Sequence, residues 1–335
     1  MRVSARERNP RRAVRARNLS WAALAGRLRR ALLAVTVVAA VVVPVSGAAR
    51  PEIPAPTPAV LAPLTASALG QVYAANRADA AEAARMAADH GDRTRAAADR
   101  AMASPSRHFL AFDGRGTGRA VEVFGDLAHA DRVAVLVPGS DTTLETYGRF
   151  RAGARALHDR LGTRGAVLAW LGYETPGTVS TTVLTADRAE DAAPRLREFL
   201  GRLRGVVGRS AHVSLLCHSY GTVVCGRAAQ GLDVSDIVVL GSPGTGASSA
   251  AALHTPARVW AARGSADWVA HVPHTSLGLF GTTVGFGTDP VSPSFGARVF
   301  RAGSAGHSDY FAPGSESLAN LTRIVLGDTS EVTRA

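Results

Sequence analysis

A serine with small residues two positions to either side lies between an apolar run and a segment of helical length. Residues 217–221 read Cys-His-Ser-Tyr-Gly, after the apolar run HVSLLC and before TVVCGRAAQ, a segment of helical length. The pattern matches G-x-S-x-G, the nucleophile elbow, except that Cys217 replaces the first glycine. Such an elbow turns sharply and lifts the serine hydroxyl clear of the sheet, so small residues are needed two positions to either side. We therefore expect Ser219 to be a nucleophile, the alternative being a serine that only caps a helix.

A serine hydroxyl is a poor nucleophile without a base, and histidine is the usual residue for that role. In elbow-type sites the order along the chain is serine, acid, histidine. Four of the ten histidines follow the serine: His254, His271, His274 and His307. The last of them lies in the glycine-rich segment AGSAGHSDYF, after an expected last strand (297–302) and before an expected helix near 315–326. A histidine in that loop can swing over the sheet, so we predict His307 as the base; a solvated loop histidine without a role is the alternative.

An acidic residue is needed to orient the imidazole and to stabilise its cation. Asp267 follows the apolar run ARVWAA in the segment ARGSADWV, where the chain order places the acid. Asp289, in GTDP, is the second candidate, whereas Asp309 is too close to His307 along the chain to reach its ring from behind. We predict Asp267 for this role, against the alternative of a turn aspartate that caps its own backbone.

Two backbone N–H groups must point at the negative charge that develops on the attacked carbonyl oxygen. The first should come from Tyr220, the residue after the nucleophile. The second should come from the loop Pro-Gly-Ser-Asp after the apolar run 133–137. We predict the amide of Ser140, with Gly139 letting the backbone come close. Standing alone, these four residues would indicate only an ordinary turn.

The predicted acid and two nearby histidines have side chains that could bind a metal ion: Asp267, His271 and His274. Their spacing does not provide a third clear ligand, and the chemistry described so far needs neither a metal nor a cofactor, so we predict none. His218 is not a second candidate base, because the side chains of adjacent residues at a strand end point apart.

The elements that must position these residues show as short apolar runs separated by segments of helical length, such as 181–204 and 220–230. Continuous apolar runs, rather than alternating ones, are typical of strands buried on both faces. The order therefore predicts an α/β fold with a mostly parallel central sheet and helices on both faces, and with ligands bound beyond the carboxyl ends of the strands. The expected central strands are 133–137, 166–171, 212–217, 236–240 and 257–262.

The segment before the expected central strands differs from them in composition. Residues 66–103 are rich in alanine and predict two helices, with Gly91 between them and Asp92 as the cap of the second. The segments 108–112 and 119–124, joined by the turn DGRG, predict a β-hairpin.

The first 49 residues have the composition of a targeting segment. They are rich in arginine up to residue 30, and residues 31–49 carry no charge and end in small residues. This pattern indicates a secretory signal, with an uncleaved N-terminal membrane anchor as the alternative. Both place the rest of the chain outside the cytoplasm. We expect a Pro-rich linker at 50–65 and one domain at 66–330, whose first part, 66–105, is helical.

The positive charge of the chain is concentrated in the same N-terminal segment. The chain has a formal net charge of +11, and residues 1–48 hold ten Arg and one Glu, so the remainder is nearly neutral. The sequence therefore argues against a nucleic-acid partner and predicts membrane contact only through the possible anchor, while it leaves the oligomeric state open. Cys217 and Cys225 are the only cysteines, and because they lie at a strand end and inside the next helix we expect two free, buried thiols.

The motifs taken together resemble those of the actinobacterial α/β-hydrolase family formerly known as DUF1023. The resemblance covers about residues 69–326 and is carried by LAFDGRGTGRAVEVFGD, VAVLVPGSDTT, WLGYETPG, CHSYGTVV, IVVLGSPGTG, ARGSADWV, FGARVF and GHSDYF. It implies the α/β-hydrolase fold, with Ser219, Asp267 and His307 as a catalytic triad. Cys217 stands where the family pattern has glycine, and the family has no settled substrate.

The expected activity is hydrolysis of an ester, or of a thioester or amide, through an acyl-enzyme, with a small acyl compound as substrate. The segments 242–250 and 268–295 are expected to line or cover the acyl site. The alternative is a non-catalytic hydrolase-like domain that binds a lipid or a protein of the cell envelope.

Overall fold

The computed structural model describes residues 53–59, 63–272, 274, 277–279 and 282–335. The expected leader, 1–49, lies outside these residues, as does part of the expected linker, 50–65. Residues Pro51–Ala335 group into one compact unit. No helix in the described ranges has both the length and the hydropathy needed to cross a membrane.

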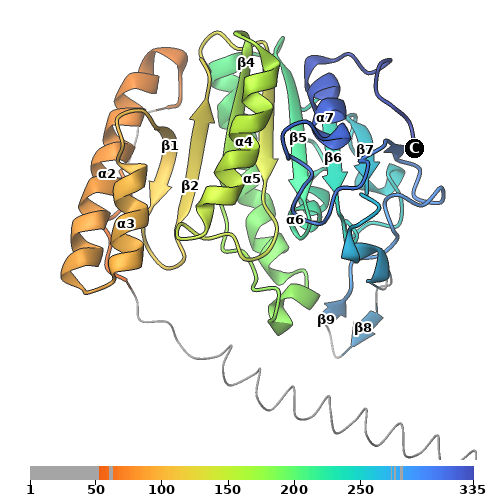
Figure 1. Ribbon diagram of the computed structural model, residues 1–335, viewed down its shortest axis with the longest axis horizontal. Helices are drawn as coiled ribbons and strands as arrows, with labels where there is room; N and C mark the ends of the chain where they lie inside the picture. Colours follow the sequence, from red (N-terminus) through yellow and green to blue (C-terminus); the bar gives the residue numbers. More distant parts are fainter. Residues whose placement is uncertain (1–52, 60–62, 273, 275–276, 280–281) are drawn as a thin grey trace, which may run out of the picture. The chain divides into compact units, whose positions relative to one another are not determined.

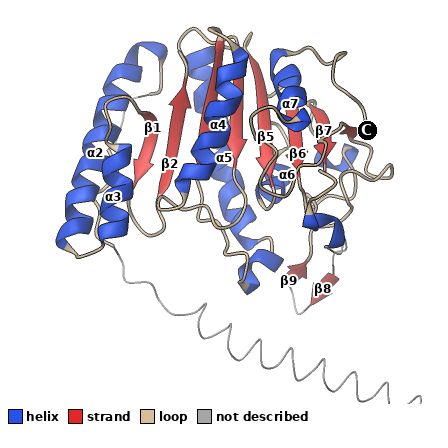
Figure 2. Ribbon diagram, viewed as in Figure 1, coloured by secondary structure: helices blue, strands red, loops and turns tan. Residues whose placement is uncertain are grey.

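A mostly parallel sheet forms the centre of the described chain, as the apolar runs predict (Figures 1 and 2). Its strand order is β1-β2-β4-β3-β5-β6-β7-β10. From β4 to β10 all neighbours are parallel, whereas β2 is antiparallel to both β1 and β4. The bounds are β1 (His108–Asp113), β2 (Arg119–Phe124), β3 (Arg132–Val137), β4 (Gly165–Leu171), β5 (His212–His218), β6 (Asp236–Leu240), β7 (Arg258–Ala262) and β10 (Arg298–Val299).

Helices cover both faces of this sheet. Residues of α5 and α6 pack in one apolar cluster and residues of α4 and α7 in a second cluster, while α2 contributes to both and packs beside β1 (Figure 1). The bounds are α2 (Leu69–Asp89), α3 (Arg93–Met102), α4 (Tyr147–Leu161), α5 (Asp187–Val207), α6 (Gly221–Ala228) and α7 (Glu316–Leu326). The predicted fold class is confirmed.

The central strands read as unbroken apolar runs because successive side chains enter different clusters. In β3, Val133 and Val135 pack in the cluster under α5 and α6, whereas Ala134 and Leu136 pack in the cluster under α4 and α7. Full burial of one valine or leucine side chain stabilises a fold by about 1.5–3 kcal/mol. Burial on both faces therefore fixes how far each strand extends across the sheet. The loops that carry the candidate site begin where the strands end, so their positions are fixed as well.

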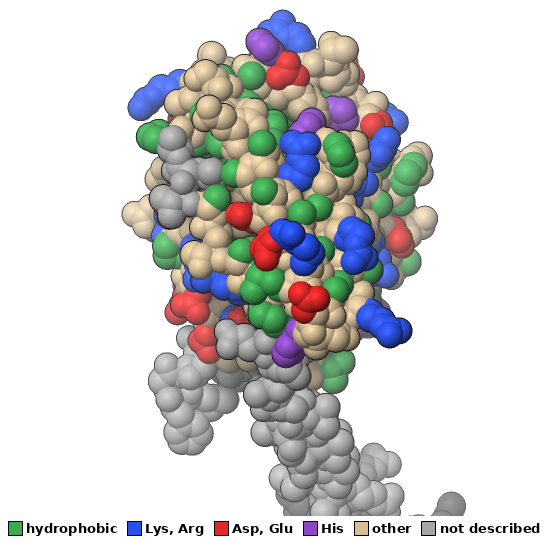
Figure 3. All heavy atoms as spheres, turned by 90° about the vertical axis from the view of Figure 1, so that its left-hand side faces the viewer, with side chains coloured by type: hydrophobic (Ala, Val, Ile, Leu, Met, Phe, Trp, Pro, Cys, Tyr) green, Lys and Arg blue, Asp and Glu red, His purple; other side chains and the backbone are tan. Residues whose placement is uncertain are grey.

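The two predicted N-terminal helices are present as α2 and α3. Gly91 between them has a φ of +89°, and the Asp92 side chain accepts a hydrogen bond from the Arg95 amide at 2.8 Å, so Asp92 is the N-cap. The predicted hairpin is also present as β1 and β2. On the side of the molecule that these helices occupy, basic, acidic and hydrophobic side chains are intermixed (Figure 3).

Two features differ from the sequence-based expectation near the end of the chain. The expected strand 297–302 pairs with β7 over only two residues, Arg298–Val299. Beyond them the backbone turns to the last residues of the chain, where the Arg301 amide donates to the Thr333 carbonyl at 2.9 Å. A short hairpin of β8 (Leu277–Leu279) and β9 (Thr282–Val284) was not expected, since neither strand has a long apolar run.

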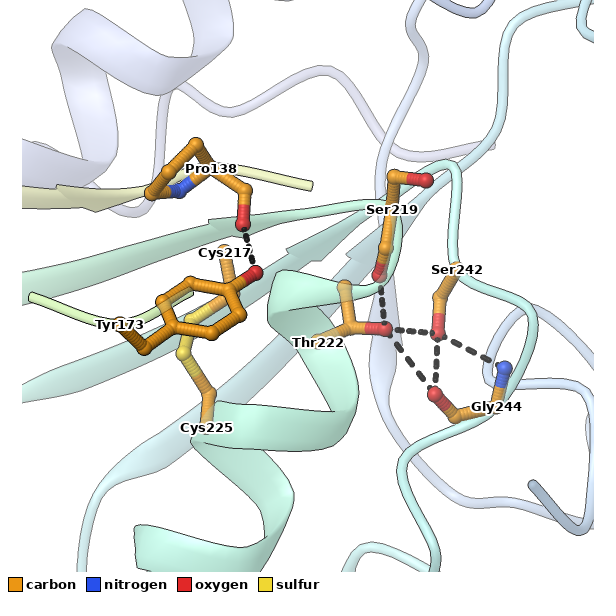
Figure 4. The surroundings of a disulfide bond; sticks show 8 residues. All are labelled: Pro138, Tyr173, Cys217, Ser219, Thr222, Cys225, Ser242 and Gly244. Atoms are coloured by element: carbon orange, nitrogen blue, oxygen red, sulfur yellow. Dashed lines mark hydrogen bonds between the residues drawn. A yellow bond between two sulfur atoms is a disulfide. The ribbon is translucent and has the colours of Figure 1, made fainter. Parts of the chain in front are cut away.

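The two cysteines form a disulfide, so the expectation of two free thiols is wrong (Figure 4). Cys217, near the end of β5, is joined to Cys225 in α6, and their Cα atoms lie 6.4 Å apart, within the limit of about 7 Å. The distance is short because the chain turns at Ser219 directly into α6. That helix packs on the same face of the sheet as the Cys217 side chain. The angle of this turn is a tertiary property that the spacing of the cysteines does not contain.

Candidate active site

The turn between β5 and α6 has the geometry of an elbow. Ser219 has a φ of +53°, a left-handed conformation that is rare for residues other than glycine. Its amide donates to the Leu240 carbonyl of β6 at 2.9 Å, and the Thr222 hydroxyl donates to its carbonyl at 2.7 Å. A Cβ at Gly221 would lie 2.5 Å from the Pro138 carbonyl oxygen, so only glycine fits there. The Ser219 hydroxyl points away from the Ser219 carbonyl and from Thr222 (Figure 4).

The structure brings together the three side chains that the sequence predicts for a triad. His307 Nε2 lies 2.9 Å from Ser219 Oγ, and His307 Nδ1 lies 2.9 Å from Asp267 Oδ1. Ser219 comes from the elbow, Asp267 from the loop after β7, and His307 from the loop between β10 and α7. The side chain of Asp267 is 0% exposed and that of His307 14% exposed. A hydrogen-bond path therefore runs from a hydroxyl to a buried carboxylate.

Each oxygen of the Asp267 carboxylate has its own donors. Oδ1 accepts from His307 Nδ1 and from the Val269 amide, and Oδ2 accepts from the Tyr310 hydroxyl at 2.5 Å. Burial acts to raise the pKa of Asp267, but hydrogen bonds from these three residues outweigh it and hold the pKa below its usual range. The carboxylate is therefore ionised at neutral pH and can stabilise a protonated imidazole.

Tyr310 is a member of this site that sequence reasoning missed. Its hydroxyl donates to Asp267 and accepts from the Gly264 amide at 3.1 Å. Burial, and then contact with the carboxylate, raise the pKa of Tyr310 far above its usual value, so the group stays neutral and donates. A Cβ at Gly241 would lie 2.6 Å from Asp267 Oδ2, so this glycine leaves room for the pair. The sequence holds one signal for Tyr310: it lies three residues after His307.

His218 is a second missed residue, and it contacts the base through the backbone. Its Nε2 lies 2.6 Å from the His307 carbonyl oxygen, and a carbonyl only accepts, so Nε2 carries the proton. Burial, and then the nearby His307, lower the pKa of His218 to about 4. At neutral pH the ring is therefore uncharged. It holds the backbone of His307 in place, which is a different role from that of a base.

The loop after β3 lies against the nucleophile. A Cβ at Gly139 would be 2.5 Å from the Ser219 Cβ, so this glycine permits the close approach that the sequence predicts. The Tyr173 hydroxyl donates to the Pro138 carbonyl at 2.7 Å, and the Asp141 amide donates to the Pro176 carbonyl at 3.0 Å.

Two amides near the nucleophile remain available for an incoming oxygen. Within the described residues, the amides of Ser140 and Tyr220 have no hydrogen-bond acceptor, whereas that of Asp141 is occupied. Both belong to segments next to Ser219, one in the loop after β3 and the other at the start of α6. They are the two amides that the sequence predicts for oxyanion binding.

The other two aspartates considered for the acid role, Asp289 and Asp309, make hydrogen bonds elsewhere. Asp289 pairs with Arg263 at 2.7 Å and also accepts from the Val291 amide at 3.2 Å. Asp309 accepts from the Gly306 amide at 3.1 Å and so shapes the turn that carries His307. Neither carboxylate is bonded to the His307 ring.

The other late histidines also point elsewhere. His271 is exposed, with Nδ1 3.3 Å from the Trp268 carbonyl oxygen, and His274 Nε2 lies 3.1 Å from the Ser242 carbonyl oxygen. His254 follows a short 3-10 turn. In the part of the chain that the structure describes, no three His, Cys, Asp or Glu side chains are grouped as metal ligands would be.

Comparison with known proteins agrees with this architecture. The sequence profile of a family described as alpha/beta hydrolase matches residues 113–277. An uncharacterized protein of Mycobacterium bovis is 33% identical over 207 residues, which cover 56% of this chain and 77% of that relative. The chain therefore belongs to the alpha/beta hydrolase family. An uncharacterized protein of Mycobacterium tuberculosis is 32% identical over 254 residues, which are 65% of this chain but only 38% of that longer relative.

Solved structures with a similar fold are more distant. The crystal structure of esterase PE8 has 17% sequence identity and a TM-score of 0.42, and the match covers 61% of this chain and 96% of that one. The 2,6-dihydroxy-pseudo-oxynicotine hydrolase has 15% identity and a TM-score of 0.44, with 79% of this chain and 85% of that chain covered.

Proposed function

We propose that this protein is an exported serine hydrolase that cleaves an ester, or a thioester or amide, through an acyl-enzyme on Ser219. The observation that carries the proposal is the hydrogen-bond path from Ser219 Oγ through His307 to the buried carboxylate of Asp267. The left-handed backbone at Ser219 supports it, since strained backbone conformations cluster at functional sites.

The first half of the proposed reaction forms the acyl-enzyme. Ser219 Oγ attacks the carbonyl carbon, and the hydroxyl proton passes to His307 Nε2. The amides of Tyr220 and Ser140 bind the oxygen that becomes negative. When the tetrahedral intermediate collapses, the bond to the leaving group breaks and His307 gives it the proton.

The second half regenerates the enzyme. A water molecule attacks the acyl carbon and passes one proton to His307, and the bond to Ser219 Oγ then breaks as that proton returns to the serine. The negative charge of Asp267 stabilises the protonated His307 that forms in both halves. Since the Asp267 side chain is 0% exposed, water screens this interaction little.

Export is the second part of the proposal. The leader sequence supports it, because a basic segment followed by a short apolar run is typical of secreted proteins. The disulfide between Cys217 and Cys225 also supports it, since disulfides persist mainly in oxidising compartments.

Labelling with a fluorophosphonate probe tests the proposed chemistry. The probe reacts with activated serines, so the wild-type protein should be labelled and the Ser219→Ala variant should not. Ser308→Ala is the matched control: this serine is exposed in the His307 loop and should not alter labelling. Full labelling of folded Ser219→Ala would exclude the assignment of the nucleophile. A folded wild type inert to every serine probe would favour the non-catalytic binding domain.

A further inference from the structure

Exposed apolar side chains gather at one edge of the sheet. Within the described residues, the large hydrophobic side chains that are at least half exposed are Val179 at 78%, Leu184 at 53% and Trp268 at 50%. All three lie in segments that follow β4 or β7, at the edge where the parallel strands end (the lower edge in Figure 1). Ser219 follows β5 at the same edge. Exposed apolar surface next to a reactive group is a feature of binding sites for apolar ligands.

Trp268 stands on the His307 side of the nucleophile. Its ring lies 4.6 Å from the His307 ring, centre to centre, at an angle of 49°. It begins a short 3-10 turn (Trp268–His271) directly after Asp267, whose side chain caps that turn. The position of Trp268 is therefore tied to the same carboxylate that orients His307.

Val179 and Leu184 lie in the segment after β4, which is on the other side of β5 from β7 and the Trp268 turn. The amide of Thr178, which precedes Val179, donates to Asp141 Oδ1 at 3.0 Å. The carbonyl of Thr185, which follows Leu184, accepts from the Tyr220 hydroxyl at 2.8 Å. The segment that carries both apolar side chains is thus fastened to the residues next to Ser140 and Ser219.

The chemistry of the reaction assigns a different part of the substrate to each side. The leaving oxygen must lie within hydrogen-bond reach of His307 Nε2, because His307 returns the proton to it. The leaving group therefore extends past the His307 ring toward Trp268. The first carbon of the acyl chain is bonded to the same carbonyl carbon and points away from the leaving oxygen, so the acyl chain extends toward the segment of Val179 and Leu184.

Two charged side chains on the acyl side pair with each other. Arg188, in the first turns of α5, makes two hydrogen bonds to Glu174 at 2.6 and 3.2 Å. The Asp141 carboxylate accepts the Thr178 amide. Beside these groups, Val179 and Leu184 expose large apolar surface, which suits contact with a hydrocarbon chain.

Resting on the proposed function, we infer that the substrate is an ester that is apolar on both sides of the scissile bond. Val179 and Leu184 contact the acyl chain, and Trp268 contacts the leaving alcohol or phenol. This refines the expectation that segment 268–295 lines the acyl site, because it places Trp268 beside the leaving group.

Two series of soluble esters separate the two contacts. In the first, the acyl chain lengthens from acetyl to decanoyl on a constant p-nitrophenol; in the second, a constant acyl group carries methanol, butanol or a phenol. For the wild type, kcat/KM should rise about two- to fourfold per added methylene until the chain passes the contact. Each assay is run below the concentration at which the ester aggregates and is repeated above it.

The variants should act on one series each. Val179→Thr combined with Leu184→Asn should flatten the acyl series, with a loss of about tenfold or more for the longest chain. Trp268→Ala should instead flatten the leaving-group series and leave the acyl slope unchanged. Val207→Thr, a half-buried valine at the far end of α5, is the control and should change neither slope.

Three results would overturn the inference. One is a wild type without chain-length dependence, another is an equal loss for all esters in both variants, and the third is activity that appears only on aggregated lipid. Fluorophosphonate labelling of Ser219 in every variant keeps the two proposals apart. Labelled protein with flat series refutes the apolar substrate alone, whereas unlabelled wild-type protein refutes the proposed function itself.

Discussion

At the scale of single residues, the notable feature is how many contacts hold His307, the proposed base. Asp267 bonds the His307 ring, His218 bonds the His307 carbonyl, and the Trp268 ring lies 4.6 Å from the His307 ring. Preorganisation of this kind removes the need to orient the imidazole during each reaction cycle. Tyr310 supports this arrangement indirectly. Its hydroxyl donates a hydrogen bond to Asp267 Oδ2, and the Asp267 side chain is fully buried.

The Tyr310→Phe variant tests this contribution, because it keeps the ring and removes the donor. The hydrogen bond lowers the pKa of Asp267, so its loss raises that pKa and moves protonation of this carboxylate to higher pH. We expect the acidic limb of the profile of kcat against pH to move to higher pH. We also expect kcat at pH 7 to fall on the order of tenfold, since a buried acceptor is left unpaired.

Tyr147→Phe is the matched control for that experiment. Its hydroxyl is also buried, but it donates at 3.4 Å to the Ala169 carbonyl of β4, away from the triad. The acidic limb should not move in this variant. An unchanged pH profile in Tyr310→Phe would show that Tyr310 only fills space.

At the scale of elements, the elbow is the critical junction. The residue two positions before Ser219 is a cysteine instead of a glycine, and its side chain crosses to α6 as a disulfide. The position after the turn, Gly221, accepts no Cβ, because the Pro138 carbonyl would be 2.5 Å away. The helix is therefore held to β5 by a covalent link that begins before Ser219, and to the loop after β3 by close backbone packing after Ser219.

Removal of the disulfide should cost stability. In the chain-entropy model, a link across eight residues stabilises a protein by about 2–3 kcal/mol. The Cys217→Ala/Cys225→Ala variant should therefore have a free energy of unfolding about 2 kcal/mol lower in urea titrations under oxidising conditions. Wild-type protein unfolded in the presence of a reductant should approach the variant. Equal free energies for variant and oxidised wild type would contradict the prediction.

The elements themselves could largely be predicted from the sequence, because the central strands are buried on both faces and so stand out as apolar runs. The positions of Asp267 and His307 followed from chain order and from their loops at the strand ends. The roles of Tyr310 and His218 could not be predicted, since each bond depends on where two distant loops meet. The disulfide was missed for a related reason: it depends on the angle at which α6 leaves β5.

At the scale of the whole molecule, buried ion pairs join the site to remote parts of the fold. Arg95 of α3 is fully buried and bonds Asp99 of the same helix at 3.0 Å. It also bonds the Gly116 carbonyl at 3.0 Å and the Glu145 carboxylate at 3.1 Å. Glu145 belongs to the segment between the loop that carries Ser140 and α4, so the N-terminal helices help to hold that loop.

A second buried carboxylate lies at the opposite edge of the sheet, where β5, β6 and β7 begin. Asp236 accepts hydrogen bonds from His212 at 2.8 Å, from Arg258 at 2.7 and 2.8 Å, and from Trp260 at 2.8 Å. Burial acts to raise the pKa of Asp236, but these donors outweigh it, and the pKa is lowered. The stability it contributes is present above the unfolded pKa of about 3.9 and is lost as pH falls through the lower folded value.

Asp236→Asn should therefore lower the free energy of unfolding at pH 7 by about 3 kcal/mol, because it leaves buried donors without their charged partner. The difference from wild type should shrink when urea titrations are repeated at pH values below about 4. Asp159→Asn, at an exposed position, should change stability by less than about 0.5 kcal/mol. A constant difference at all pH values would refute the role of the Asp236 charge.

The activation of Ser219 by His307 is tested most directly by the rate of covalent modification. The second-order rate constant for reaction with a fluorophosphonate should be measured for wild type and for His307→Gln, with peptide mapping of the modified residue. We expect the adduct on Ser219 and a rate constant lower in the variant by a factor on the order of 10³ or more. Equal rate constants in the two folded proteins, or an adduct on another residue, would contradict the account.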